Sequence, residues 1–257
     1  MKNEFWRTSI SQVKTDEILV RGYPIEDLVG CRTFGDIVYL LLTGELPKGA
    51  EGRLIEAMLV SCCEHSLAAP SVGAVRFVAS AGVPLQTAVA AGVSAIGEVH
   101  GGATEACARI LKSGVSEQKP AQQIFEELRA KGQRLPGYGH RVHNKDPRVA
   151  ALCGVATELG LMGAHTKLAI ELEKTAEAVL NRPLAMNVDG IIAALICDIG
   201  ISPELGKSIF IVGRAPGYAA HAHEQNTQER AFKAPSPQDI YYTGPERRDL
   251  PKIQRQS

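Results

Sequence analysis

Residues 187–217 read NVDGIIAALICDIGISPELGKSIFIVGRAPG, and this stretch decides the fold class. Its apolar residues recur at intervals of three and four positions, which is the period of an α-helix. Ser202 and Pro203 mark a helix start, because proline lacks the N–H group that the first helical turn leaves unbonded. The stretch therefore predicts two consecutive apolar helices, over residues 188–199 and 203–222.

The same helical period continues through the rest of the chain, in which aromatic residues make up only 5%. Thr33 and Asp36 resemble a capping box, and Gly44 is a plausible left-handed stop for the helix between them. Residues 8–23 alone have strand character, and so short a piece makes no more than a hairpin. We therefore predict an all-α fold, with further helices over residues 34–43, 50–66, 72–81, 84–96, 103–113, 120–131, 147–159 and 165–181.

Composition narrows the class of protein. The chain has 257 residues, which allows one large domain or two modest ones. Lys plus Arg and Asp plus Glu both number 28, so no net positive field favours nucleic acid or an anionic membrane. The N-terminal residues are polar, and no apolar run approaches the ~20 residues of a membrane span. We predict a cytoplasmic protein that binds neither nucleic acid nor membrane.

Three further features concern cysteines and possible subunit contacts. The cysteines lack CxxC spacing, so we interpret them as reduced, mostly buried thiols; they are residues 31, 62, 63, 107, 153 and 197. The segment 84–97 is rich in Ala, Gly and Ser, which suits a buried or a subunit-facing helix. The tail from Lys233 to Ser257 holds four prolines and many charges, so we expect it to be extended and to wrap a partner subunit.

Polar residues in glycine-rich or apolar surroundings are the candidates for chemistry. The segment GEVHGG, residues 97–102, places His100 before two glycines that let a ligand approach closely. The segment LPGYGHRVHNKDPR, residues 135–148, concentrates cationic and imidazole groups in a rigid loop, which suits a ligand bearing carboxylates and phosphates. Neither His140 nor His143 has an HExxH pattern or a cysteine partner, so we predict no metal.

A carboxylate and an arginine complete the candidate set. Asp189 stands at the start of a hydrophobic helix, where the helix N-terminus favours its ionised form and apolar surroundings oppose it. It is either a general base or a helix cap. Arg214 lies in an apolar helix and needs an anionic partner, which the substrate could supply. His100 could equally be a satisfied core histidine, and His65 near a helix end is a weak signal alone.

Together these segments resemble the citrate synthase superfamily, in order and over nearly the whole chain. The resemblance rests on RGYPIEDL at residues 21–28, YLLLTGELP at 39–47, VHGGATEA at 99–106, GYGHRVHNKDPR at 137–148 and NVDG at 187–190. It implies an all-α, two-domain fold and a homodimer or larger oligomer. The large domain would comprise residues 1–102 and 201–257, and the small inserted domain residues 103–200.

The resemblance also implies a role for each candidate residue. Asp189 would exchange a proton with the methyl carbon beside a thioester, and His100 would hydrogen-bond the thioester oxygen as an enolate forms. His140 would polarise the keto oxygen of oxaloacetate, or take the hydroxyl proton in the reverse direction. The substrate carboxylates would be held by His65, Arg148 and Arg214. Coenzyme A, a substrate here rather than a cofactor, would contact Leu135, Gly137, Tyr138, Gly139 and Arg141.

Departures from the superfamily pattern favour one reaction. Ordinary citrate synthases are much longer and carry an arginine near the C-terminus, whereas APSPQDIYYTG at residues 234–244 has none. The short length and the NVDGIIAALICDIG segment look more like stand-alone citryl-CoA lyase and the lyase module of ATP citrate lyase. The resemblance thus implies metal-free cleavage of (3S)-citryl-CoA to acetyl-CoA and oxaloacetate. The alternatives are citrate or 2-methylcitrate synthesis and, less favoured, a non-catalytic acyl-CoA-binding subunit.

Overall fold

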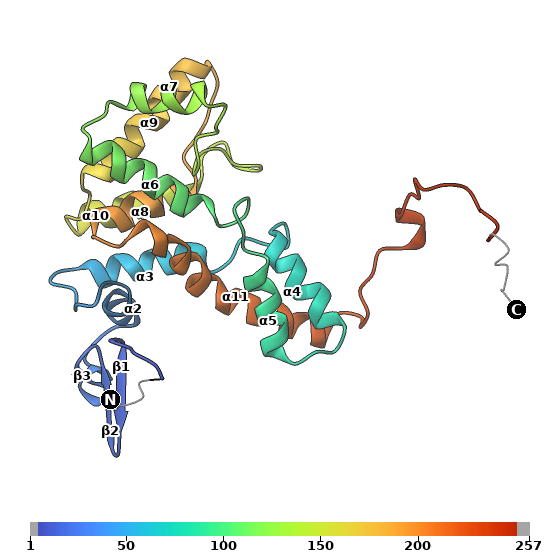
Figure 1. Ribbon diagram of the computed structural model, residues 1–257, viewed down its shortest axis with the longest axis horizontal. Helices are drawn as coiled ribbons and strands as arrows, with labels where there is room; N and C mark the ends of the chain where they lie inside the picture. The colour runs from blue at the N-terminus through green and yellow to red at the C-terminus, as the bar shows by residue number, and fades with distance from the viewer. Residues whose placement is uncertain (1–4, 251–257) are drawn as a thin grey trace, which may run out of the picture.

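The computed structural model describes residues 5–250, and its regular secondary structure is mostly α-helix (Figure 1). The predicted all-α fold is therefore confirmed, and every predicted helix has a counterpart. The helices are α1 Ile25–Leu28, α2 Phe34–Thr43, α3 Glu51–Cys62, α4 Pro70–Ser80, α5 Leu85–Ser94, α6 Ala103–Ser116, α7 Ala121–Ala130, α8 Pro147–Glu158, α9 Ala164–Leu180, α10 Val188–Asp198 and α11 Gly206–Gln228. Two 3-10 turns accompany them, η1 Pro203–Leu205 and η2 Pro237–Asp239.

The predicted hairpin near the N-terminus is present with one further short strand. Strands β1 Ser11–Lys14, β2 Glu17–Val20 and β3 Tyr23–Pro24 form an antiparallel sheet in that order. Val13 pairs with Ile18 across the first turn, where Asp16 has a left-handed backbone with φ 58°. A sheet this small leaves the domain's stability to helix packing.

Local capping signals in the sequence are reproduced in the structure. Helix α2 has the predicted bounds, the Thr33 side chain accepts the N–H of Asp36, and Asp36 reciprocates. Gly44 ends the helix at φ 95°, a conformation that costs glycine little. Asp146 caps α8 by accepting the N–H of Arg148 at 3.1 Å. These interactions join residues within a few positions of one another, so the sequence alone specifies them.

The predicted boundaries of α3 and α11 were wrong at three ends. The start at Ser202 and Pro203 is the 3-10 turn η1, and the Ser202 hydroxyl binds Glu204 instead of capping the backbone. Helix α11 begins at Gly206 and continues past residue 222 to Gln228, through Pro216. Helix α3 ends at Cys62 rather than at residue 66 because the carboxylate of Glu64 binds the next backbone N–H groups and the chain turns.

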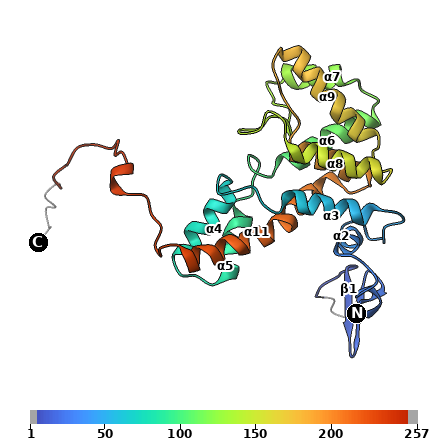
Figure 2. The ribbon, with the colours of Figure 1, turned by 180° about the vertical axis from the view of Figure 1, so that it is seen from behind.

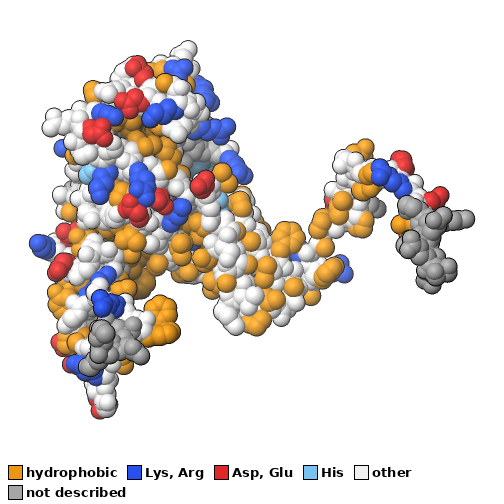
Figure 3. Space-filling model, in the orientation of Figure 1, with side chains coloured by type: hydrophobic (Ala, Val, Ile, Leu, Met, Phe, Trp, Pro, Cys, Tyr) orange, Lys and Arg blue, Asp and Glu red, His pale blue; other side chains and the backbone are white. Residues whose placement is uncertain are grey.

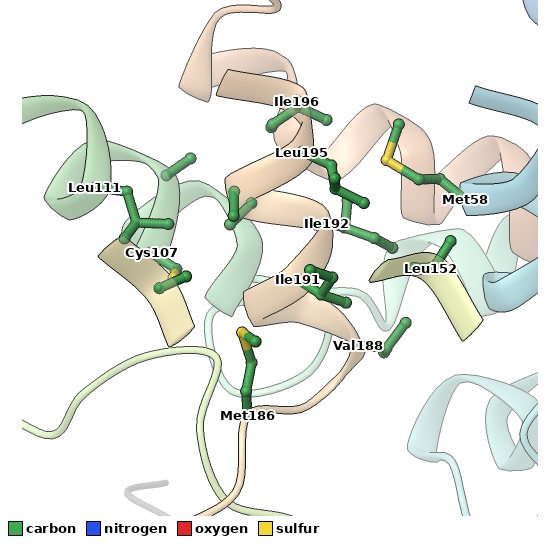
Figure 4. Packing of buried hydrophobic residues seen from close by; sticks show 14 of the residues in the cluster. Met58, Cys107, Leu111, Leu152, Met186, Val188, Ile191, Ile192, Leu195 and Ile196 are labelled. Carbon is green, nitrogen blue, oxygen red and sulfur yellow. The ribbon is translucent and has the colours of Figure 1, made fainter. Parts of the chain in front are cut away.

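Helix α10 lies at the centre of the larger hydrophobic core (Figure 4). Its residues from Ile191 to Ile196 are almost completely buried. Cys107 and Leu111 from α6 pack on one side of it, and Leu152 from α8 packs on the other. Since α10 begins beside Asp189, this packing fixes the position of that carboxylate.

A smaller core holds α4 and α5 against the second half of α11, around Val75, Ala88 and Tyr218. Gly92 makes this approach possible, because a Cβ there would lie 2.5 Å from the side chain of Val75. Helix α11 therefore joins both cores. Helices α2 and α3 share the larger core with α6 to α10, and the domain boundaries at residues 103 and 200 stay a prediction.

The remaining expectations concern surfaces and thiols. Residues 84–97 were expected to form either a buried or a subunit-facing helix. The structure excludes a buried helix, since only Ala88 and Gly92 of α5 are buried. The tail from Lys233 is extended apart from η2 and leaves the body of the molecule in both views (Figures 1 and 2), while residues 251–257 lie outside the described part. All six cysteines are free; Cys62 and Cys107 are buried and Cys31 is exposed. Among the described residues, no helix is long and apolar enough to cross a membrane.

Candidate active site

Segments far apart in the sequence line one pocket of about 250 Å³. Each comes from a different element: the turn between α3 and α4, the loop before α6, the loop before α8, the start of α10 and the middle of α11. The predicted residues in its lining are His65, His100, Gly139, His140, Arg141, Arg148, Asp189 and Arg214. The fold thus assembles both predicted histidine segments, the aspartate and the arginines around one cavity.

Asp189 projects into this pocket from the first turn of α10. The helix is capped by Asn187, whose side chain accepts the N–H groups of Asp189 and Gly190 at 3.0 and 3.3 Å. The alternative of Asp189 as the cap is therefore wrong. Burial raises the pKa of Asp189, against the hydrogen bond that Thr104 donates at 3.1 Å and the charges of Arg148 and Arg214. A carboxyl with a raised pKa is the stronger base once ionised.

The loop before α8 is attached to the start of α10 by backbone hydrogen bonds. The Asn187 N–H donates to the Gly137 carbonyl at 3.0 Å, and the Asn187 side chain donates to the Gly139 carbonyl at 2.8 Å. Gly137 has φ 81°, and a Cβ there would lie 2.6 Å from the Cα of Gly190. Glycine is therefore required at residue 137 by both conformation and space.

Leu135, Gly137 and Tyr138 do not reach the lining of the pocket. All three are buried, and the Tyr138 hydroxyl donates to the Ala169 carbonyl at 2.7 Å inside the core. Gly139 and Arg141 do line it. The three buried residues therefore support the loop from beneath. Of the five predicted coenzyme A contacts, only Gly139 and Arg141 face the cavity.

His100 is anchored by a serine that sequence reasoning missed. Its Nε2 lies 2.7 Å from the Ser71 hydroxyl of α4, and its ring meets Phe210 edge-on at 5.7 Å. Burial lowers the pKa of His100, and the positive charges of Arg214 and Arg141 act in the same direction. The imidazole is therefore neutral at pH 7 and suited to hydrogen bonding.

His140 has its protonation pattern set by the backbone. Its Nδ1 accepts the N–H groups of Val142 and His143, each at 3.0 Å. Burial lowers the pKa of His140, helped by the neighbouring His143 and His65. A neutral ring whose Nδ1 accepts two hydrogen bonds carries its hydrogen on Nε2. His140 can therefore donate a hydrogen bond to an oxygen in the pocket.

His65, His140 and His143 form a cluster whose possible ligand atoms lie within 4.8 Å of one another. Three imidazoles could hold a metal ion. A ligating histidine usually donates its other ring N–H to an acceptor. In His140 that other nitrogen faces two N–H donors instead, so coordination through Nε2 would place three hydrogens together. The hydrogen bonding of the cluster suits an oxygen-bearing ligand better than a metal.

Besides Arg141, the arginines Arg148 and Arg214 contribute positive charge to the pocket. Asp146 binds Arg148 through two side-chain bonds, to Nε at 2.9 Å and to the terminal nitrogen at 2.7 Å, and also accepts the N–H of Val188. Arg214 is only 2% exposed, and its Nε donates to the Cys62 carbonyl. One terminal nitrogen of Arg214 is buried with no hydrogen-bond partner in the described part of the chain.

The unpaired nitrogen of Arg214 has a counterpart in His65. The Nε2 of His65 is also buried without a partner among the described residues. Burial lowers the pKa of His65, as do the charges of Arg148 and Arg214. Buried polar atoms normally have hydrogen-bond partners, and these two belong to residues that line one cavity, which favours a polar, anionic ligand there.

Ser71, Thr104, Asp146 and Asn187 are the polar residues whose part in the site was not predicted. Asp146 carried a signal, but only as a helix cap, and Thr104 stands inside the VHGGATEA segment without a feature of its own. Ser71 is 29 residues from His100 in the sequence. No spacing rule connects two such distant residues, so only the packing of α4 against the loop before α6 reveals the contact.

Comparisons with known proteins agree with this architecture. A family model described as "Citrate synthase, C-terminal domain" matches residues 2–52 and 49–235. The structure of citryl-CoA lyase from Hydrogenobacter thermophilus is similar with a TM-score of 0.92 at 41% identity, covering 96% of this chain and 98% of that chain. A mutant ATP citrate lyase of Methanosaeta concilii in complex with (3S)-citryl-CoA shares the fold at 24% identity, with a TM-score of 0.86 over 96% of this chain and 43% of that one.

Curated relatives are more distant and longer. Citrate synthase of Haloferax volcanii is 32% identical over 198 residues, which cover 75% of this chain and 52% of that protein. Glyoxysomal citrate synthase of Cucurbita maxima is 30% identical over 203 residues, covering 76% of this chain and 39% of that protein. The predicted superfamily is confirmed because the family model covers most of the residues, and the chain belongs to the citrate synthase family.

Proposed function

We propose that this protein is a citryl-CoA lyase, which cleaves (3S)-citryl-CoA to acetyl-CoA and oxaloacetate. The similarity to the Hydrogenobacter thermophilus lyase supports this, since it extends over 96% of this chain and 98% of that chain. The citrate synthases it matches are longer, and this chain spans only 39–52% of the two compared above. In the proposed reaction one carbon–carbon bond breaks and the thioester stays intact.

The observation that carries the proposal is the composition of the pocket. It brings Asp189, with its raised pKa, together with two neutral imidazoles and two arginines. Citryl-CoA offers two free carboxylates, a tertiary hydroxyl and a thioester. The carboxylates match Arg148 and the buried atoms of Arg214 and His65 that have no hydrogen-bond partner among the described residues.

The hydroxyl and the thioester oxygen of the substrate would meet the two imidazoles. The Nε2–H of His140 donates to the hydroxyl oxygen, which becomes the keto oxygen of oxaloacetate. With the Ser71 hydroxyl donating to Nε2, His100 carries its hydrogen on Nδ1 and donates to the thioester oxygen as negative charge develops there. A neutral donor in a buried site suits an enolate because it stabilises the charge without adding a proton.

Asp189 would move the one proton that the reaction transfers. The Asp189 carboxylate takes the proton of the substrate hydroxyl. The carbon–carbon bond then breaks, and the electrons of that bond form the enolate of acetyl-CoA. Asp189 then returns the same proton to the methyl carbon and is a carboxylate again. We assign the hydroxyl proton to Asp189 rather than to His140 because Nε2 of the neutral His140 already holds a hydrogen. No metal or further cofactor takes part in this proposal.

We also propose that the working form is a homodimer or larger homo-oligomer in the cytoplasm. Hydrophobic side chains cover much of the face over α4 and α5, whereas charged side chains gather over the upper helices (Figure 3). Phe77 on α4 and Leu85 on α5 are about half exposed, and Ile240, Tyr241 and Tyr242 of the tail are more exposed still. A large exposed apolar face of this kind commonly marks a protein interface.

The decisive experiment incubates the purified protein with synthetic (3S)-citryl-CoA. Oxaloacetate is followed with coupled malate dehydrogenase and acetyl-CoA by mass spectrometry, with Asp189→Asn as the control. Release of both products, lost in the variant, supports the lyase and its base together. Formation of citrate from acetyl-CoA and oxaloacetate would instead identify a synthase, and coenzyme A binding without any turnover would identify a non-catalytic subunit.

A further inference from the structure

A carboxylate just outside the pocket links the turn that carries His65 to helix α11. One oxygen of Glu64 accepts the backbone N–H of His65 at 2.9 Å and also that of Ser66. The other oxygen lies 3.1 Å from Nε2 of His221 on α11. The Glu64 side chain therefore stabilises the conformation of the turn and also connects the turn to helix α11.

The turn needs this support because its backbone is strained. Ser66 has φ 68°, a left-handed conformation that a residue with a Cβ adopts at a cost. The two backbone N–H groups that converge on one oxygen of Glu64 offset that cost. Burial raises the pKa of Glu64, but the hydrogen bonds from His221 and from the backbone outweigh it, so its pKa is lowered and the acceptor stays ionised.

Helix α11 approaches the turn closely at the same place. A Cβ at Gly217 would lie 2.3 Å from the Cys63 carbonyl and 2.8 Å from a Glu64 oxygen, so this approach requires glycine. Two side chains of α11 bind the turn, one on each side of this glycine. Arg214 donates to the Cys62 carbonyl, and His221 contacts the Glu64 carboxylate. His65 lies directly after these contacts, with its Nε2 buried and unpartnered in the described structure.

The groups around His221 keep it in place from the other side. Its Nδ1 lies 3.7 Å from Glu224, and Glu224 binds the buried Arg76 at 2.6 Å. Arg76 also donates to the backbone carbonyl of His221 at 3.3 Å. Arg76 of α4 thus holds the backbone at His221, while the Nδ1 of the imidazole has no hydrogen-bond partner among the described residues, so the ring's one close polar contact among them is with Glu64.

We propose that Glu64, supported by His221, is a positioning residue that holds His65 toward a carboxylate of the substrate. The proposal rests on the proposed function, in which His65 binds that carboxylate. A contact made equally in the bound substrate and in the transition state changes KM and leaves kcat unchanged. Loss of the Glu64 support should therefore appear in KM.

The experiment compares removal of the support with its conservative replacement. In Glu64→Ala and His221→Ala, KM for (3S)-citryl-CoA is expected to rise roughly tenfold, the effect of losing one hydrogen bond to a charged group, with kcat nearly unchanged. Glu64→Gln keeps an oxygen for the backbone N–H groups, and His221→Gln keeps a donor for Glu64, so both should restore most of the affinity. The double alanine variant should be no worse than Glu64→Ala, because both residues act through one turn.

His223 provides the matched control. It lies on the same helix and is exposed, so His223→Gln should leave KM unchanged. A second readout, the ¹⁵N shifts of the His65 ring assigned with His65→Gln, does not depend on turnover. These shifts should move in Glu64→Ala and not in His223→Gln even if wild-type protein fails to cleave citryl-CoA, which separates this inference from the lyase assignment.

The inference is overturned by two results. One is a Glu64→Ala variant whose melting temperature falls while KM and the His65 ring shifts stay at wild-type values, since that describes a purely structural contact. The other is a rise in KM that Glu64→Gln does not relieve, because the retained acceptor would then have failed to hold the turn.

Discussion

The hydrogen bond from Thr104 to Asp189 provides a direct test of the proposal that Asp189 is the base of the site. Thr104 is 1% exposed, and its hydroxyl donates to Oδ1 of Asp189 at 3.1 Å. This bond stabilises the carboxylate and so opposes the raised pKa that burial gives Asp189. Thr104→Val removes the hydroxyl and keeps the branched shape, so the change should act on the ionised carboxylate with little repacking.

The magnitude follows from the strength of the bond. A hydrogen bond to a charged group contributes about 1.5 kcal/mol at the low end of the observed range. Its loss raises the pKa of Asp189 further and lowers the ionised fraction about tenfold at any pH below the pKa. Above the pKa the carboxylate remains ionised and is a slightly stronger base. We therefore expect kcat/KM to fall about tenfold on the acidic side of the pH profile and to be unchanged on the alkaline side.

The assay is the pH dependence of citryl-CoA cleavage with coupled oxaloacetate detection. Thr104→Ser keeps the hydroxyl and loses only the methyl group, so its profile should follow that of the wild type. In the Asp189→Asn background, Thr104→Val should have no effect on any residual rate. A uniform loss across all pH values would refute the reasoning, because it would show that Thr104 acts through packing.

Three other outcomes follow from the site. Asp189→Asn should abolish turnover yet raise the melting temperature at pH 8. Burial raises the pKa of Asp189, so ionisation of this carboxyl destabilises the fold as pH rises above its ordinary pKa of 3.8. The increase in melting temperature should therefore shrink as the pH is lowered. Arg214→Lys, which loses the planar donors, should raise KM roughly tenfold in steady-state assays, and an unchanged KM would remove Arg214 from substrate binding. Treatment with EDTA should leave turnover unchanged, whereas a loss that added metal restores would contradict the hydrogen-bond pattern of His140.

Much of the fold could be predicted from the sequence because its signals are local. The capping box at Thr33, the left-handed stop at Gly44 and the cap at Asp146 each use partners within a few residues. The errors arose where a distant or unrecognised partner intervened. Helix α3 stops early because Glu64 binds the next two N–H groups, and α11 runs on through Pro216 because it packs against both cores.

The candidate site divides in the same way. The motif segments around His100, His140 and Asp189, and the need of Arg214 for an anionic partner, could be recognised in the sequence. Which of the predicted coenzyme A residues face the pocket could not be predicted. Tyr138, for example, is turned into the core, where its hydroxyl donates to the carbonyl of Ala169 on α9, a residue far from it in the sequence.

The sequence by itself determined where most of the helices lie, which family the chain belongs to and which residues are candidates for the chemistry, because helix periodicity, caps and motifs are short-range patterns. Tertiary structure alone decided the chemical state of those residues. Ser71 sets the hydrogen bonding of His100 from a different helix, and burial by the α10 core raises the pKa of Asp189. The contact between Glu64 and His221 joins two elements far apart in the chain. Such effects depend on distances and solvent exclusion, which arise only when distant segments pack together.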